Sequence, residues 1–254
     1  MGDSAELVLF GGFTLRIEGT KVALPMHARR VLAYLSLRKM VEPDTDRGVL
    51  AERLWADATP DRSRASLRTA IWRIRSVGGN LLTGEADRVA LADRVRVDVH
   101  DFRRRAERIL AADPNVDSMA IDRLDTERIG APPHLHIPVD LLPGWDEDWL
   151  ILAREQLRLL GLHALEQSAH TLCASGRYPE AIDTILRVVD EEPLRESAQA
   201  VLIDAHLRAG HPAEAYRHYA AFARKLWDEL GIRPSGEIAL LVRGLPPAAV
   251  VSSR

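Results

Sequence analysis

The spacing of apolar residues changes several times along the first hundred positions of the chain. Residues 7–24 contain short apolar or alternating runs separated by glycine-containing turns, which predicts two or three short antiparallel strands. Apolar residues then recur at helical spacing over residues 28–35 and again from about Asp46 to Trp55. This half of the chain therefore begins with strands and continues with helices.

The next predicted helix, DRSRASLRTAIWRIRS (residues 61–76), carries five arginines. On a helical wheel its apolar side chains form one stripe expected to face a core, made of Leu67, Ala70, Ile71, Ile74 and Val77. The opposite face carries Ala65, Arg68, Thr69, Trp72, Arg73 and Ser76, with Arg62, Arg64 and Arg75 at its edges. Like charges four residues apart cost a few tenths of a kcal/mol in a helix. The arrangement therefore needs a reason other than helix stability.

The residues after this helix predict a turn and a pair of strands. Gly78-Gly79-Asn80 ends the helix, and RVALADRVRVDV (88–99) alternates around Ala92-Asp93 as a β-hairpin does. Strands, three helices and a hairpin, in this order, are typical of a winged helix-turn-helix. The arginine-rich helix then occupies the place of the recognition helix.

The second half of the chain is predicted to be helical and repetitive. A helix is expected from Asp98, a proline-rich extended segment at 128–144, and a long helix from about Asp146. The segments ASGRYPEAIDTI (174–185) and RAGHPAEAYRHY (208–219) match at an offset of 34 residues, the period of tetratricopeptide repeats. Helix pairs of this kind bury their apolar faces by stacking on one another.

These patterns define the expected fold class and domain organisation. We expect a mainly α protein with small β elements. Its N-terminal winged helix-turn-helix domain would cover residues 1–103, and an all-α, tetratricopeptide-like domain would cover residues 104–254.

Charge is distributed unevenly over the 254 residues, whose formal net charge is −3. Residues 1–103 contain 17 Lys and Arg against 14 Asp and Glu, whereas residues 104–254 contain 17 against 23. A mildly basic and an acidic domain indicate different partners. No apolar run approaches the ~18–20 residues of a membrane span, and the N-terminus does not resemble a signal peptide. We therefore expect a cytoplasmic, nucleoid-associated protein without membrane contact.

Double-stranded DNA is the partner that best accounts for the arginine-rich face. A duplex presents a phosphate every ~1.7 Å of its axis, and its major groove admits one helix. Arginine bridges phosphates and also reads guanine O6 and N7 in a bidentate manner. A solvated cationic helix is the alternative interpretation. The position of this helix in a winged-helix order favours DNA recognition.

Several of these segments resemble known families. LRTAIWRIRSVGG (67–79) is similar to the recognition helix of OmpR/PhoB-type winged helices, with Arg73-Ile74-Arg75 in place of their R-L-R-like triplet. Four later segments resemble the bacterial transcriptional activator domain: LLPGWDEDWLILAREQLRLL (141–160), GRYPEAI (176–182), EEPLRESAQAVLIDAHLRAG (191–210) and ELGIRPSGE (229–237). The two modules in this order resemble the SARP-type regulators, the antibiotic regulatory protein family of actinobacteria.

The resemblance implies a transcriptional activator that binds direct repeats near promoters and recruits RNA polymerase, often for a secondary-metabolite gene cluster. A direct-repeat site suits a homodimer or two protomers side by side. Carried over by position, the groove-facing residues are Arg68, Thr69, Trp72 and Arg73, and Arg73 aligns with the first arginine of the triplet. Their positions on the wheel assign phosphate contacts to Arg62, Arg64 and Arg75.

Two positions depart from the family pattern. Trp72 stands where a small or basic residue is usual, and the sequence leaves open whether its ring stacks on DNA or packs inward. In the predicted wing, Asp87-Arg88 replaces the Gly-Tyr pair that the family often has. The wing remains basic, and its candidate DNA contacts are Arg88, Arg94 and Arg96.

Enzymes and metalloproteins are poor matches. G-x-S-x-G, H-E-x-x-H and G-x-G-x-x-G motifs do not occur, and His134 and His136 lack the further ligands that zinc requires. Cys173 is the only cysteine and is expected to be a small buried side chain. We expect no catalysis, no cofactor and no metal. The alternative function is a protein-interaction adaptor whose winged helix does not bind DNA specifically. Such an adaptor would not need the arginine face.

Overall fold

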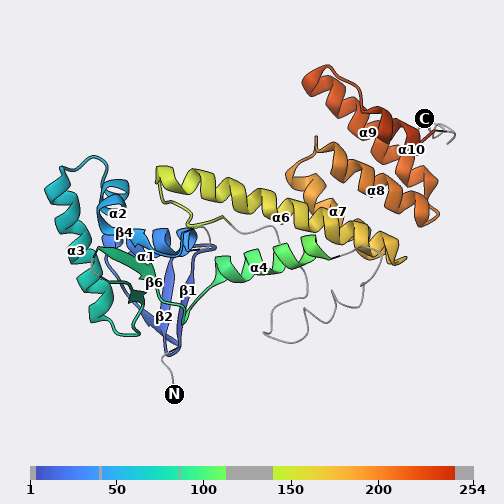
Figure 1. The fold of residues 1–254 in the computed structure, drawn as a ribbon. Helices are drawn as coiled ribbons and strands as arrows, with labels where there is room; N and C mark the ends of the chain where they lie inside the picture. The colour runs from blue at the N-terminus through green and yellow to red at the C-terminus, as the bar shows by residue number, and fades with distance from the viewer. Residues whose placement is uncertain (1–3, 40–41, 86, 113–139, 244–254) are drawn as a thin grey trace. The chain divides into compact units, whose positions relative to one another are not determined.

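The computed structural model describes residues 4–39, 42–85, 87–112 and 140–243, which form two compact units (Figure 1). Described residues up to Arg104, together with residues 140–157, make up the first unit. Residues 105–112 and 158–243 make up the second. A domain boundary after residue 103 stays a prediction. None of the helices in the described ranges combines the length and apolar character that crossing a membrane requires.

Three strands are present at the N-terminus, where the sequence predicts two or three, and they form most of a four-stranded sheet. β1 (Ala5–Val8) pairs antiparallel with β2 (Thr14–Ile17), and β2 pairs antiparallel with β3 (Thr20–Val22). β7 (Val95–Val97) lies on the other side of β1 and runs parallel to it, with Leu7 opposite Val97. Alternate residues of β1 and β7 are buried, so one face of this sheet contributes to the core of the first unit.

The three predicted helices of the first unit are confirmed as α1 (Met26–Arg38), α2 (Arg47–Leu54) and α3 (Pro60–Ser76). Asp46 determines where α2 begins, because its carboxylate accepts the backbone N–H of Gly48 at 2.7 Å and of Val49 at 3.0 Å. The apolar residues of α1 and α3 contribute to the same core as the sheet. The prediction of an N-terminal winged helix-turn-helix is therefore confirmed.

The predicted hairpin over residues 88–99 is wrong. β6 (Arg88–Leu91) lies between β4 (Thr45–Asp46) and β5 (Leu82–Thr83) in a three-stranded sheet, whereas β7 belongs to the four-stranded sheet. The alternation correctly predicts two strands, but alternation does not say which strand pairs with which. The edge of β1 takes β7, and β6 pairs with β5 to form the hairpin of the wing.

The helical pattern predicted from Asp98 is confirmed as α4 (Asp98–Ala111). The Asp98 carboxylate accepts the backbone N–H groups of Leu9 and Phe10 at 2.9 Å, which ties the start of α4 to the end of β1. Most of the predicted proline-rich segment lies outside the described residues. Leu142, from the last part of that segment, donates its N–H to the carbonyl of Leu9 at 2.9 Å.

The second unit is built from helical hairpins. The long helix predicted from about residue 146 is α6 (Asp148–Ala174), which belongs to the second unit from Arg158 onward. It is followed by α7 (Tyr178–Glu191), α8 (Glu196–Arg208), α9 (Pro212–Leu230) and α10 (Gly236–Leu241). Cys173 is buried, as expected.

Two of these turns show the predicted repeat directly. Gly176 and Gly210 follow α6 and α8 with φ of 75° and 79°. In each turn the N–H of the next residue bonds to the carbonyl five positions back: Arg177 to Leu172 at 2.9 Å, and His211 to His206 at 2.8 Å. This is the Schellman helix ending, repeated after 34 residues. The tetratricopeptide-like character of the unit is therefore visible in its backbone.

Candidate nucleic-acid interface

The arginine-rich helix α3 is anchored by one face and open on the other. Leu67, Ala70, Ile71 and Ile74 are buried, and α3 packs against α1 and α2. Pro60 occupies the first turn, where its missing N–H costs nothing, and Asp61 follows it where the helix dipole favours an acid. The helix therefore forms and docks without using any of its basic side chains.

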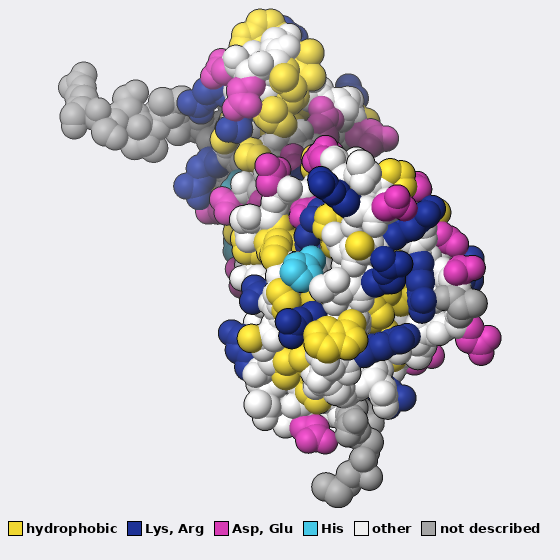
Figure 2. All heavy atoms as spheres, turned by 90° about the vertical axis from the view of Figure 1, so that its left-hand side faces the viewer, with side chains coloured by type: hydrophobic (Ala, Val, Ile, Leu, Met, Phe, Trp, Pro, Cys, Tyr) yellow, Lys and Arg dark blue, Asp and Glu magenta, His cyan; other side chains and the backbone are white. Residues whose placement is uncertain are grey.

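Every predicted recognition-helix contact is exposed. The set comprises Arg62, Arg64, Arg68, Thr69, Trp72, Arg73 and Arg75. Figure 2 shows this side of the molecule, where dark-blue Lys and Arg side chains gather around yellow hydrophobic ones.

The five arginines of this face have no acidic counterpart. Among the described residues, no carboxylate forms an ion pair with any of them. Other arginines of the first unit are paired, such as Arg16 with Glu6 at 3.4 Å and Arg38 with Glu42 at 2.6 Å. None of these five guanidinium groups is engaged in an ion pair within the described residues, which leaves them available to a polyanion.

Trp72 points outward. Its side chain is 60% exposed, so the structure excludes the inward-packed alternative. The guanidinium carbon of Arg73 lies 4.9 Å from the centroid of the Trp72 ring, within the range of a cation–π contact. The two side chains therefore form one exposed unit.

A hollow of about 600 Å³ lies beside the recognition helix. Leu67, Ile71 and Trp72 supply its apolar lining. Its charged lining combines four arginines with two acids, namely Arg47, Arg64, Arg68, Arg75, Asp46 and Asp87. Arg47 is not among the residues that the sequence predicts for this site. The available signal was its place in the first turn of α2, directly after the capping residue Asp46.

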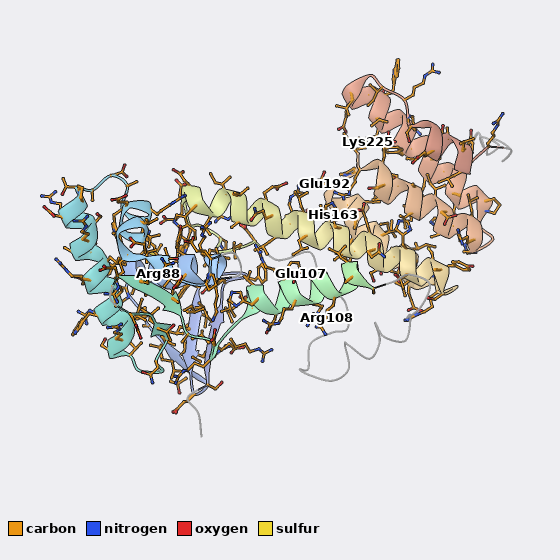
Figure 3. All side chains as sticks on the ribbon, viewed as in Figure 1. Arg88, Glu107, Arg108, His163, Glu192 and Lys225 are labelled. Atoms are coloured by element: carbon orange, nitrogen blue, oxygen red, sulfur yellow. The ribbon has the colours of Figure 1, made fainter. Side chains whose placement is uncertain are left out.

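The structure separates the three arginines predicted in the wing. Arg88 begins β6 beside the β5–β6 turn (Figure 3), where it forms an ion pair with Asp44 and donates to the Asp44 carbonyl at 2.9 Å. The hydrogen bond from Arg88 lowers the pKa of the Asp44 carboxyl. Arg94 follows the opposite end of β6, and Arg96 lies in β7, where it pairs with Asp101 at 2.8 Å. Only Arg88 lies at the turn of the wing.

The wing turn itself requires glycine. Gly84 has φ of 115°, and a Cβ atom at this position would lie 2.6 Å from the carbonyl oxygen of Arg88.

The two histidines considered as metal ligands, His134 and His136, lie outside the described residues. Across the described ranges, no group of three His, Cys, Asp or Glu side chains is placed to hold a metal ion.

A winged helix-turn-helix with an exposed arginine-rich face, in a chain that also carries repeated helical hairpins, defines a class of transcriptional regulators. Comparison with known proteins supports this class. Residues 139–245 match the model of the bacterial transcriptional activator domain. The chain is 27% identical over 204 residues to the regulatory protein AfsR of Streptomyces griseus, an alignment that covers 76% of this chain and 20% of AfsR.

Two further comparisons agree. The chain is 28% identical over 221 residues to AfsR of Streptomyces coelicolor, covering 81% of this chain and 20% of AfsR. It therefore spans about one fifth of the length of these curated relatives. The solved structure of Mycobacterium tuberculosis EmbR in complex with a low-affinity phosphopeptide has a similar fold, with a TM-score of 0.76 and 21% identity over 94% of this chain and 64% of that chain. Together these findings support a resemblance to SARP-type transcriptional regulators, with a bacterial transcriptional activator domain at residues 139–245.

Proposed function

We propose that this protein is a sequence-specific DNA-binding transcriptional activator that inserts α3 into the major groove. The observation that carries the proposal is the exposed face of α3, on which five arginines have no acidic partner among the described residues. Neither the helix dipole nor helix propensity explains this arrangement. A DNA duplex supplies the phosphates and guanine edges that arginine binds.

Each side chain has a role that follows from its place on the helix. The proposed base contacts come from the outward face, namely Arg68, Thr69, Trp72 and Arg73. The proposed phosphate contacts come from its edges, namely Arg62, Arg64 and Arg75. Arg88 is the wing residue best placed to approach the DNA backbone. Its ion pair with Asp44 partly neutralises the positive charge that it would bring to a phosphate. Arg94 and Arg96 lie away from the wing turn and add only to the general positive field.

The remaining functions fall to the activator domain. We propose that residues 1–103 bind DNA and that residues 104–254, which are acidic overall, contact RNA polymerase and a second protomer. Two protomers side by side would fit a direct repeat near a promoter, where the protein would act in the cytoplasm on the nucleoid. A secondary-metabolite gene cluster is the proposed target, because the sequence resembles the SARP-type family.

The decisive experiment is selection of binding sites from a random duplex library with the purified protein. We expect enrichment of a short motif repeated in direct orientation at a spacing of about one helical turn. The double variant Arg68→Glu/Arg73→Glu should keep its fold, because both side chains are exposed, and should lose binding.

A charge-reversed control variant distinguishes loss of the proposed DNA contacts from a general effect of added negative charge. Arg16→Glu changes an exposed arginine in the four-stranded sheet and should leave binding near the wild-type level. If the folded wild-type protein enriches no motif and binds a duplex no better than the double variant, the proposal fails and the adaptor alternative is favoured.

A further inference from the structure

We infer that Trp72 and Arg73 read a thymine methyl group and the guanine of a neighbouring base pair as one unit. The inference rests on the proposed function and adds the base chemistry that the site must contain.

The position of Trp72 on α3 directs its ring toward the bases. On the helical wheel Trp72 lies near the middle of the exposed face, and the short side chains of Ala65 and Ser76 lie next to it on one side. The arginines that can reach phosphates lie toward the two edges of the same face. A helix docked in the major groove therefore turns its edges to the sugar-phosphate backbone and Trp72 to the floor of the groove.

The chemistry of the ring selects what it can contact there. Trp72 is 60% exposed and presents a large apolar surface that gains nothing from polar base edges. The apolar group displayed in the major groove is the C5-methyl of thymine, because the other edges present hydrogen-bond donors and acceptors. A tryptophan at this position therefore favours thymine through burial of that methyl group.

The contact between Trp72 and Arg73 sets the distance between the two bases that are read. The guanidinium carbon lies 4.9 Å from the ring centroid, and consecutive base pairs are about 3.4 Å apart along the axis. Because the guanidinium is held close to the ring, we expect it to read a base pair adjacent to the one that Trp72 contacts. Its planar fork matches O6 and N7 of guanine, and its contact with the ring restricts its rotamers before DNA binds.

The test replaces single thymines of the selected motif with uracil, which removes only the methyl group. In a titration with synthetic duplexes we expect one thymine in each repeat at which uracil weakens binding about fourfold, the value expected for burying one methyl group. In Trp72→Ala the same replacement should have no effect at that position. Replacing the neighbouring guanine with 7-deazaguanine should weaken binding by wild type and have no effect in Arg73→Ala.

A matched variant shows that the effect belongs to Trp72. Arg64→Gln should weaken binding to all duplexes and keep the fourfold response to uracil. Circular dichroism of Trp72→Ala should match wild type, because the side chain is not part of the core. If the protein binds its motif but no thymine responds to uracil, or if the response persists in Trp72→Ala, the inference is overturned and the proposed function stands. If no motif is selected, both are overturned.

Discussion

Glu166 of α6 accepts two hydrogen bonds from the guanidinium of Arg195, the residue that immediately precedes α8. Nε lies 2.7 Å from Oε1 and Nη2 lies 2.9 Å from Oε2. The two side chains are only 12% and 20% exposed, and the Ser197 hydroxyl donates to the same carboxylate at 2.7 Å. A bidentate pair of this kind, shielded from water, fixes the start of α8 against α6 within the second unit.

Removal of this carboxylate should destabilise the protein strongly. Glu166→Ala leaves the Arg195 guanidinium largely buried without its partner, and we expect the free energy of unfolding to fall by about 3 kcal/mol. Urea denaturation followed by circular dichroism measures the change. Glu229→Ala, which removes an exposed pair with Lys225, should change the same quantity by less than about 0.5 kcal/mol. Equal losses in the two variants would contradict a special role for Glu166.

The repeat turn should tolerate only glycine at its left-handed position. Gly210 has φ of 79°, and a Cβ atom there would meet nothing within 4 Å, so the cost of Gly210→Ala comes from the backbone alone. We expect a loss of about 1 kcal/mol in thermal or chemical unfolding. Gly236→Ala is the matched control, because Gly236 begins α10 without a positive φ and its Cβ also has space. That variant should be neutral or slightly more stable, and a comparable loss would refute the argument.

The second unit should lose stability in mild acid. Burial lowers the pKa of His206, and His218, whose ring stacks on it at 5.0 Å, acts in the same direction. Burial also lowers the pKa of His218. Arg217 and His211 oppose protonation of His206 as well, whereas Glu214 favours it.

The sign of the pH effect follows from these lowered pKa values. As pH falls below the ordinary histidine value of about 6.5, the unfolded chain takes up protons that the folded chain does not, so folding stability decreases. Unfolding midpoints measured between pH 7.5 and 5 should show this decline, and His206→Gln should reduce it. His163→Gln, which changes an exposed histidine of α6 (Figure 3), should leave the decline intact. A midpoint that rises toward pH 5 would contradict the prediction.

Arg64, a proposed phosphate contact, and Arg73, a proposed base contact, should differ in their effects on salt dependence and on specificity. Arg64→Gln removes one proposed phosphate contact, so the slope of log K against log salt should become shallower by about 0.9 while the preferred motif stays the same. Arg73→Gln should instead relax the preference at one base pair. Fluorescence anisotropy at several salt concentrations, with matched and mutated duplexes, measures both quantities. A changed motif in Arg64→Gln would argue against its role at phosphate.

The sequence predicts the exposed face of α3 well because the buried stripe of the helix must repeat at helical spacing. The residues on the opposite side, including Arg68 and Trp72, are therefore exposed. The wing was predicted less well. Val89 and Val95 both belong to alternating, half-buried segments, and nothing local to residues 88–99 says that the strands enter different sheets. Strand partners depend on residues far away in the chain, such as Thr45 opposite Val89.

The contact of Arg73 with the Trp72 ring could not be predicted from the sequence either. Neighbouring residues on a helix point about 100° apart, and only the rotamers decide whether a guanidinium reaches over the adjacent ring. The pairing of Arg88 with Asp44 joins residues 44 positions apart, which no local pattern reveals. The periodicity of the sequence therefore identifies which arginines are exposed. The tertiary structure determines which of these arginines are free of ion pairs.

The parallel pairing of β7 with β1 imposes an order on synthesis at the ribosome. Ala5 pairs with Val95, so the edge of β1 stays open until some ninety further residues have been translated. By then α1, α2 and α3 have all been made. An uncovered strand edge is a template for association with other chains, and closure of so long a loop is slow. The α3 segment is therefore translated before the four-stranded sheet can be completed, and β1 is the strand whose edge stays open in the meantime.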